Sequence, residues 1–238
     1  MVSHLKRRSY SMYLLRILLI STLVILIAHL VLQYLNLIIY DQQNGFIYEL
    51  SNRFDLDDES SIATWFSQAI FIAISAGATL AAYLSSVTAV RRLWKSIAVL
   101  SLLLSIDEVT AMHELILQSL HNIFFKDTSS TISGNAWLLV APLVFAGALW
   151  LLWKIAKLLP RRTLILFAGA IFTFLVGAVF VDMLASLVER ETFINQGIII
   201  AIEETLELLG SVLVLYAIAD YIEVNHGARL KSALTHLK

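Results

Sequence analysis

The chain has 238 residues, of which 59% are hydrophobic and only 15% are charged, and its mean hydropathy is +0.80. A soluble domain is closer to half apolar and a quarter charged, so this composition excludes an ordinary soluble protein and indicates a lipid bilayer as the solvent. The net charge of −1 gives no reason to expect a nucleic-acid partner. The absence of cysteine excludes disulfides, thiolate metal sites and cysteine nucleophiles.

Six segments are long enough to cross a bilayer as helices, which requires about 20 mostly apolar residues each. They cover residues 14–39, 64–90, 96–120, 136–159, 163–187 and 197–221. The first run is too long for the apolar region of a signal peptide, so we expect it to remain as a span. Because the runs are continuously apolar instead of alternating, they favour helices over barrel strands. The sequence therefore predicts an all-α fold in which residues 1–238 form a single transmembrane domain, a polytopic bundle of six transmembrane helices.

Lysine and arginine are distributed unevenly between the predicted loops. Six spans place 14 of the 17 basic residues on one side and only Arg53, Lys126 and Arg190 on the other. Since basic residues are retained on the cytoplasmic side, we expect a multi-pass protein of the inner (plasma) membrane with both termini in the cytoplasm. The first outer loop, 41–63, carries six acids against Arg53 alone. It is either a solvated acidic loop or a vestibule that attracts cations.

Seven carboxylates lie inside three of the predicted spans, in the slab between the bilayer midplane and the outer face. The third span contributes Asp107, Glu108 and Glu114 together with His113, the fifth contributes Asp182, and the sixth contributes Glu203, Glu204 and Glu207. No Lys or Arg lies at the same depth. One unpaired charge at the bilayer centre costs at least ~2.5 kcal/mol, so protons, a metal ion or both must compensate these acids.

Helical spacing predicts which of these acids converge. On a continuous third span, Asp107 and Glu114 share one face and His113 lies off it, while Glu203, Glu207 and Gly210 share a face of the sixth span. In the first span, His29, Gln33 and Asn36 form a polar stripe. Such stripes are expected to face the bundle interior.

Because these polar stripes are expected to face the bundle interior, we predict a buried cation site, which we expect to hold a divalent metal ion. Its candidate ligands are Asp107, His113, Glu114, Asp182, Glu203 and Glu207, and the candidate catalytic acid or base residues are Glu108 and Glu204. Oxygen ligands with one or two imidazoles suit Zn, Mn or Fe, whereas carboxylates alone suit Ca, Mg or Mn. The alternative is that each acid is a protonated packing residue.

Four stretches carry a resemblance to known sequences: FDLDDESSIATWFS at 54–67, LSIDEVTAMHE at 104–114, the AW pair at 136–137 and EETLELLG at 203–210. In these motifs the chain resembles an uncharacterised group of bacterial six-span membrane proteins with LSxDExxxxHE and EExLExxG motifs. The resemblance supports the membrane architecture and the choice of residues, and it implies no reaction. Zinc proteases are excluded, because Leu117 stands where their second histidine would be.

Three functions remain open at this stage. A metal-dependent membrane enzyme would use the ion to activate water or to polarise a lipid-like substrate. A cation- or proton-coupled transporter would use the same acids as a relay. A non-catalytic subunit of a membrane complex would present its helices to partner proteins. The expected partners are therefore the lipid bilayer, a lipid-like substrate or a cation, and an oligomer or membrane complex.

Overall fold

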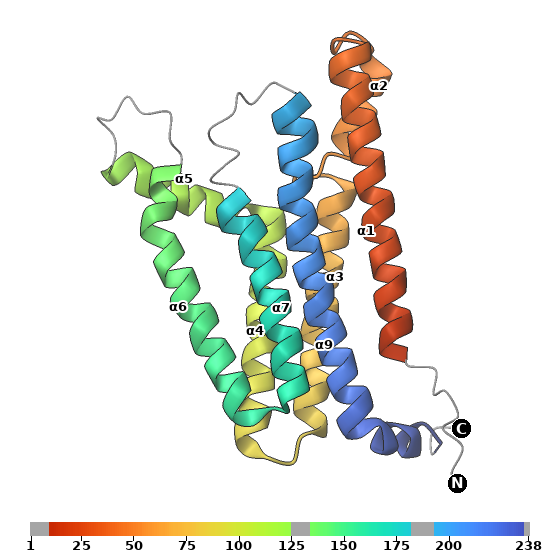
Figure 1. Cartoon of the computed structure of the whole chain (residues 1–238), viewed down its shortest axis with the longest axis vertical. Helices are drawn as coiled ribbons and strands as arrows, with labels where there is room; N and C mark the ends of the chain where they lie inside the picture. Colours follow the sequence, from red (N-terminus) through yellow and green to blue (C-terminus); the bar gives the residue numbers. More distant parts are fainter. Residues whose placement is uncertain (1–9, 125–133, 182–192, 236–238) are drawn as a thin grey trace.

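A computed structural model describes residues 10–124, 134–181 and 193–235, and within these ranges every regular element is a helix. The long helices run up and down between the two ends of a bundle (Figure 1). In chain order the elements are α1 (Tyr10–Tyr34), the π-helical η1 (Leu35–Ile39), α2 (Gly45–Arg53), α3 (Ile62–Leu84), α4 (Thr88–Thr110), α5 (Met112–Phe124), α6 (Gly134–Leu158), α7 (Arg161–Leu175), the π-helical η2 (Val176–Val181) and η3 (Phe193–Ile199), and α9 (Ile200–Thr235).

Four helical runs are long and apolar enough to cross a membrane. They are Tyr10–Ile39, Ile62–Leu84, Val140–Leu158 and Arg161–Val181, and they coincide with the first, second, fourth and fifth predicted spans. The bent pair α4–α5 makes a fifth crossing if it is counted as one span. The helix α9, which covers the sixth predicted span, is not among them. The structure is therefore that of a helical protein with several membrane-length helices, and the count of six spans stays a prediction.

The third predicted span is not one straight helix. The helix α4 ends at Thr110, and Ala111 adopts a left-handed conformation with φ 43° and ψ 39° before α5 begins at Met112. The α5 segment from Leu115 to Phe124 lies at 72° to α4, so α5 runs across the end of the bundle (Figure 1). The prediction of one continuous helix over 96–120 is therefore wrong, and the face assigned to Asp107 and Glu114 was based on that continuity.

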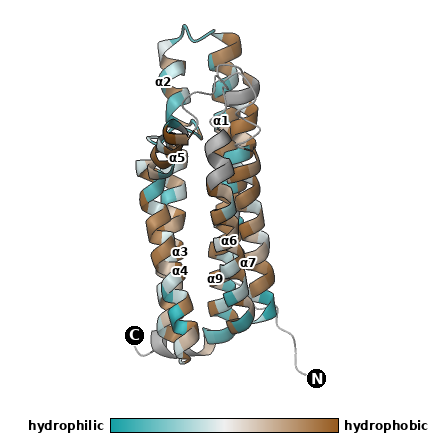
Figure 2. Cartoon of the chain, turned by 90° about the vertical axis from the view of Figure 1, so that its left-hand side faces the viewer, coloured by the Kyte–Doolittle hydropathy of each residue, from teal (hydrophilic) through white to brown (hydrophobic). Residues whose placement is uncertain are grey.

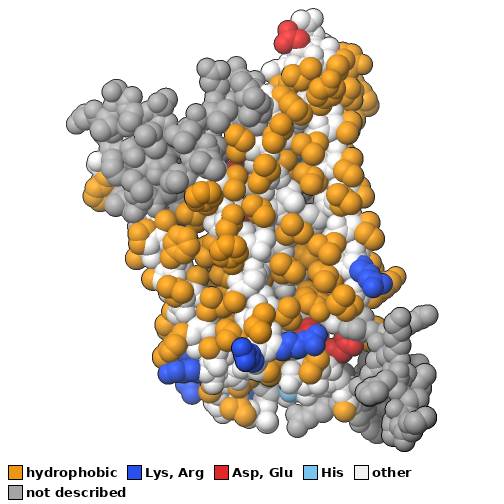
Figure 3. Space-filling model, viewed as in Figure 1, with side chains coloured by type: hydrophobic (Ala, Val, Ile, Leu, Met, Phe, Trp, Pro, Cys, Tyr) orange, Lys and Arg blue, Asp and Glu red, His pale blue; other side chains and the backbone are white. Residues whose placement is uncertain are grey.

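The two ends of the bundle differ in charge. In Figure 3 most of the visible Lys and Arg side chains lie in the lower part of the molecule. The α3–α4 and α6–α7 connections lie at this end (Figure 1). We call this the basic end, and it carries Arg91, Arg92, Lys154, Lys157, Arg161 and Arg162. The start of α1 and the end of α9 lie at the same end (Figure 1). Between the two ends, apolar residues dominate the helices (Figure 2).

The helix α9 lies within the bundle and packs against α1, α3 and α7 (Figure 1). Toward the basic end its Tyr221 ring lies 4.8 Å from the ring of Trp94, which in turn lies 6.0 Å from the ring of Phe167. Next to this aromatic cluster, Arg162 donates two hydrogen bonds of 2.8 and 2.7 Å to the buried carboxylate of Asp220. Aromatic packing and a two-point ion pair therefore fix α9 against α4 and α7.

Candidate metal centre

Three glutamates stand close together near the start of α9, at the end of the bundle opposite the basic end. We call Glu203, Glu204 and Glu207 the acidic trio. Their spacing of one and three residues places them on one side of the helix. Carboxylate oxygens from all three lie within 4.8 Å of one another, and each side chain is half-buried. This group of oxygens is compact enough to hold a metal ion.

Other acids surround the trio from neighbouring elements. Glu108, in the last turn of α4, shares a hydrogen bond with the side chain of Ser67 on α3. Glu204 lies within electrostatic range of Glu108 and of Asp57, which belongs to the loop between α2 and α3. The carboxyl groups of the loop between α2 and α3 and those near the ends of α4 and α9 therefore belong to one cluster of acids.

Close packing of α7 and η2 against α9 positions the trio. A Cβ atom at Gly210 would lie 2.6 Å from the Cβ atom of Phe174, so the two helices approach each other where α9 has no side chain. Gly177 on η2 makes the reciprocal contact with α9 at the level of the trio. Packing therefore explains why Gly210 ends the EExLExxG motif, because a larger residue would push α7 away from α9.

Asp107 and His113 are paired with each other and lie outside the trio. The backbone N–H of His113 donates to Asp107 Oδ1 over 3.0 Å, and His113 Nδ1 lies 2.9 Å from Asp107 Oδ2. Both side chains are partly exposed, at 54% for His113 and 29% for Asp107. The pairing follows from the break at Ala111, which turns His113 back toward Asp107. The prediction that His113 lies off the Asp107 face is therefore wrong.

The structure thus brings together part of the predicted site. Glu203, Glu204 and Glu207 share one place, and Glu108 lies nearby. Asp182 and the side chain of Glu114 lie outside the described residues, so their roles as ligands stay predictions.

A family model described as a domain of unknown function, DUF8692, matches residues 14–221. The chain belongs to this family. No curated protein and no solved structure matches the chain. The DUF8692 match extends from α1 to the aromatic cluster of α9, so the acidic trio lies inside the family domain.

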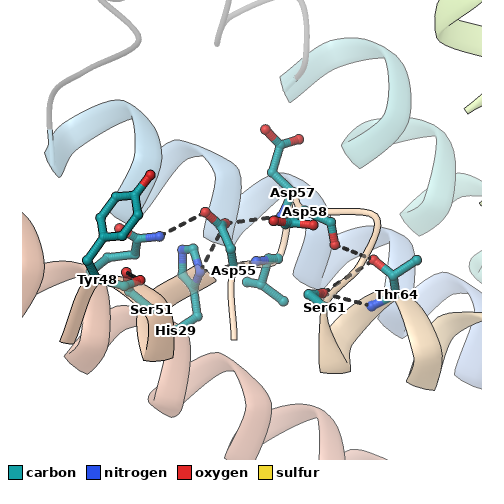
Figure 4. A network of polar contacts seen from close by, with 10 residues as sticks. His29, Tyr48, Ser51, Asp55, Asp57, Asp58, Ser61 and Thr64 are labelled. Carbon is teal, nitrogen blue, oxygen red and sulfur yellow. Dashed lines mark hydrogen bonds and ion pairs between the residues drawn. The ribbon is translucent and has the colours of Figure 1, made fainter. Parts of the chain in front are cut away.

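A second polar network in the DUF8692 domain joins α1 to the loop that precedes α3 (Figure 4). The backbone N–H of Leu56 donates to Nδ1 of the fully buried His29 over 3.2 Å. Gln33 Nε2 donates to Asp55 Oδ2 over 2.9 Å, and Asp55 Oδ1 lies 3.6 Å from His29 Nδ1. The sequence indicated the polar stripe of α1, but it did not indicate that Asp55 would be its partner.

Burial raises the pKa of Asp55 from 3.8 to about 6, and the charges of Asp57 and Asp58 act in the same direction. Hydrogen bonds from the backbone N–H of Asp57 and from Gln33 oppose the shift, because they stabilise the ionised form. Asp55 therefore changes charge near pH 6, whereas an exposed aspartate does so near pH 4.

An apolar groove of about 290 Å³ lies between α1 and the start of α9. Leu26 and Leu30 line it from α1, and Ala201, Ile202 and Leu206 line it from α9. At 100° per residue, Ile202 lies on the side of α9 opposite Glu204, whereas Leu206 lies only about 60° from Glu203. The apolar groove therefore borders the side of α9 that carries Glu203.

Proposed function

We propose that the chain is an integral membrane protein that binds a divalent metal ion through the acidic trio, in a bacterial inner membrane with both termini in the cytoplasm. The observation that carries the proposal is the convergence of oxygens from Glu203, Glu204 and Glu207 within 4.8 Å. In this orientation the basic end faces the cytoplasm, in agreement with the positive-inside rule, and the trio opens toward the outer face.

Electrostatics support a bound cation. Two full charges 4.8 Å apart repel by about 3 kcal/mol at an effective dielectric constant of 20. Three such pairs, with Glu108 and Asp57 within range of Glu204, add to this repulsion. A divalent ion offsets two charges and orders several oxygens at once, which protons achieve only if each protonated acid also finds an acceptor.

The donor atoms favour a hard metal ion. The trio offers only carboxylate oxygens, and the imidazole of His113 is engaged with Asp107. Oxygen ligands alone suit Ca²⁺, Mg²⁺ or Mn²⁺, whereas Zn²⁺ prefers nitrogen or sulfur in its set. We therefore expect one of these three ions and not zinc.

We favour a metal-dependent membrane enzyme over a transporter. A metal at the trio would polarise a substrate or activate water, and Glu108, which lies within electrostatic range of Glu204, is the candidate to accept a proton. Toward the basic end, Trp94, Phe167 and Ile218 are at most 1% exposed and fill the interior. This apolar packing argues against a cation path through the bundle. In the proposed orientation the trio opens toward the outer face, so a substrate is expected to reach it from there.

Metal analysis of the detergent-purified protein tests the proposal. We expect stoichiometric Ca, Mg or Mn in the wild-type protein, and a loss of most of it in Glu204→Gln and Glu207→Gln. Glu49→Gln is the matched control, because it removes one charge from an exposed position on α2. Equal metal content in all four proteins would place any ion elsewhere, and no metal even after dialysis against these ions would refute the proposal.

A further inference from the structure

A polar cavity of about 240 Å³ lies between the end of α1, η1, α2 and the loop that follows α2. We call it the polar cavity. Six of its seven lining residues are polar, namely Gln33, Asn36, Gln42, Tyr48, Asn52 and Asp55. It does not include any residue of the trio, so it is a separate site with separate chemistry.

Asn36 is the first reason to expect a ligand in the polar cavity. The side chain is only 4% exposed, and its Oδ1 atom is buried without a hydrogen-bond partner in the described part of the chain. Buried acceptors are almost always paired, because the cost of removing them from water is otherwise not recovered. A donor that enters the polar cavity would satisfy this oxygen.

Asp55 gives the polar cavity its charge. Gln33 holds the Asp55 carboxylate through the 2.9 Å hydrogen bond to Oδ2. No lysine, arginine or histidine is among the lining residues in the described chain, and Asp57 and Asp58 lie next to Asp55 in the loop. The polar cavity is therefore rich in acceptors and carries a negative charge whenever Asp55 is ionised.

The backbone that closes the polar cavity is strained. Asp41 and Gln42 both have positive φ values, 44° and 57°, in the turn between η1 and α2. The backbone N–H of Gln42 donates to the carbonyl of Asn36 over 2.9 Å, which fixes Gln42 at the wall of the cavity. Two successive non-glycine residues in this conformation are costly, and such strain is concentrated at functional sites and ligand clamps.

We propose that the polar cavity binds a small organic cation with several N–H donors, an alkylammonium or guanidinium compound. Its positive charge would pair with Asp55, and its N–H groups would donate to Asn36 Oδ1 and to the neighbouring carboxamide and phenol oxygens. The volume of about 240 Å³ is too large for a bare metal ion, since one water occupies roughly 30 Å³ of liquid. It is also below the size of a drug-sized pocket, so a small metabolite fits best.

Putrescine and agmatine are suitable probes, and 1,4-butanediol is the uncharged match of putrescine. We expect each amine to raise the melting temperature of the full-length protein in detergent and to give a saturable isotherm in calorimetry, and we expect butanediol to do neither. The effect should be lost in Asp55→Asn and Asn36→Leu. It should remain in Glu49→Gln, which removes an acid outside the cavity, and in Glu207→Gln, which alters the trio.

Folding of the variants is controlled in the same experiment. Asn36→Leu keeps the size of the side chain and removes an unpaired acceptor, so its melting temperature without ligand should not fall. Gln42→Gly relieves the positive φ and should also fold, while it weakens the binding of putrescine. The proposal is overturned if neither amine binds, if butanediol binds equally well, or if Asp55→Asn and Asn36→Leu retain the effect. The proposal would also be overturned if only Glu207→Gln lost amine binding, because the amine would then occupy the trio.

Discussion

Gly177 and Glu203 are in backbone contact: a Cβ atom on Gly177 would lie 2.7 Å from the carbonyl oxygen of Glu203. The same atom would lie 3.0 Å from Cγ of Glu207. The π-helical segment η2 therefore runs directly against the acidic trio, and π-helical turns of this kind occur frequently at functional sites. The absence of a side chain at Gly177 determines how closely η2 and α9 approach.

We predict that Gly177→Ala destabilises the protein and disturbs the trio. The obstacle is a backbone oxygen, which cannot move without a shift of α9, so we expect an overpacking cost of about 1–3 kcal/mol. Metal retention should fall with it, because Glu203 and Glu207 would be displaced. The measurements are the melting temperature in detergent and the metal content.

Gly169→Ala is the matched control for this prediction. Gly169 lies on the same helix pair, in α7, but a Cβ atom there would meet nothing within 4 Å. Alanine is the better helix former by roughly 1 kcal/mol, so this variant should be neutral or stabilised. If Gly177→Ala and Gly169→Ala melted at the same temperature, the close approach of η2 to α9 would be refuted.

The second prediction concerns Asp107, which the structure places as a cap for α5. Asp107→Ala removes the acceptor of the His113 backbone N–H and should destabilise the start of α5 by about 1 kcal/mol. Asp107→Asn keeps an acceptor oxygen and should retain most of this stability. Neither change should alter metal content, since Asp107 lies outside the trio.

Hydrogen exchange measures where in the chain the Asp107→Ala variant loses stability. In Asp107→Ala we expect faster exchange in the first turn of α5, with α3 and α7 unchanged. A loss of bound metal in Asp107→Asn would contradict the capping role and would restore Asp107 as a ligand.

Local periodicity explains what could be predicted from the sequence. The long apolar runs predict helices because a bilayer leaves the backbone no other way to satisfy its polar groups within one segment. The grouping of Glu203 with Glu207 needs only the 3.6-residue period of one helix, and it was predicted correctly as a shared face. Both inferences depend on neighbours in sequence.

The features that could not be predicted depend on tertiary contacts or on an unfavourable backbone. Ala111 is the best helix-forming residue type, and nothing in the local sequence indicates that it would adopt a left-handed conformation. The contact of Asp55 with Gln33 joins residues 22 positions apart. Helical spacing could not identify Asp55 as the partner of Gln33, because their contact depends on the path of α2 and of the loop that follows it.

The third prediction is a pH dependence of stability from Asp55. Its pKa is raised from 3.8 to about 6, so the folded state binds more protons than the unfolded state between these values. The contribution of Asp55 to the stability of the folded state is therefore complete below pH 3.8, and it is lost as the pH rises through about 6. Lowering the pH from 7.5 to 5 should raise the free energy of unfolding by about 1.4 kcal/mol. This is the change over one pH unit when the folded state binds one more proton than the unfolded state.

Asp55→Asn isolates this contribution from that of the other acids. Melting temperatures of the wild type and of Asp55→Asn are compared at pH 5 and pH 7.5. A contribution of about 1.4 kcal/mol corresponds to a shift of roughly 3–6 °C in a chain of this size. The groups that face Asp55 are His29, Gln33, Asp57 and Asp58, so Glu49→Gln serves as the variant that should keep the wild-type pH dependence. Identical pH profiles for the wild type and Asp55→Asn would show that Asp55 titrates as an exposed acid.

The last prediction is that chelation destabilises the protein more at pH 8 than at pH 5. Removing a divalent ion leaves three carboxylates with oxygens within 4.8 Å, and at pH 8 few protons are available to replace the ion. At pH 5 protons bind to the trio and relieve part of the repulsion, so the effect of the chelator should shrink. With free metal at about 100 times its dissociation constant, the bound ion contributes about 2.7 kcal/mol. Its removal should lower the melting temperature by about 5–10 °C at pH 8.

Glu207→Gln keeps the size of the side chain and removes one charge, so it should reduce the chelator effect, whereas Glu49→Gln should leave it unchanged. If the melting curves with and without chelator coincide at both pH values, the trio is a protonated hydrogen-bond network, and a transport or scaffolding role would then explain the acids better than a metal centre.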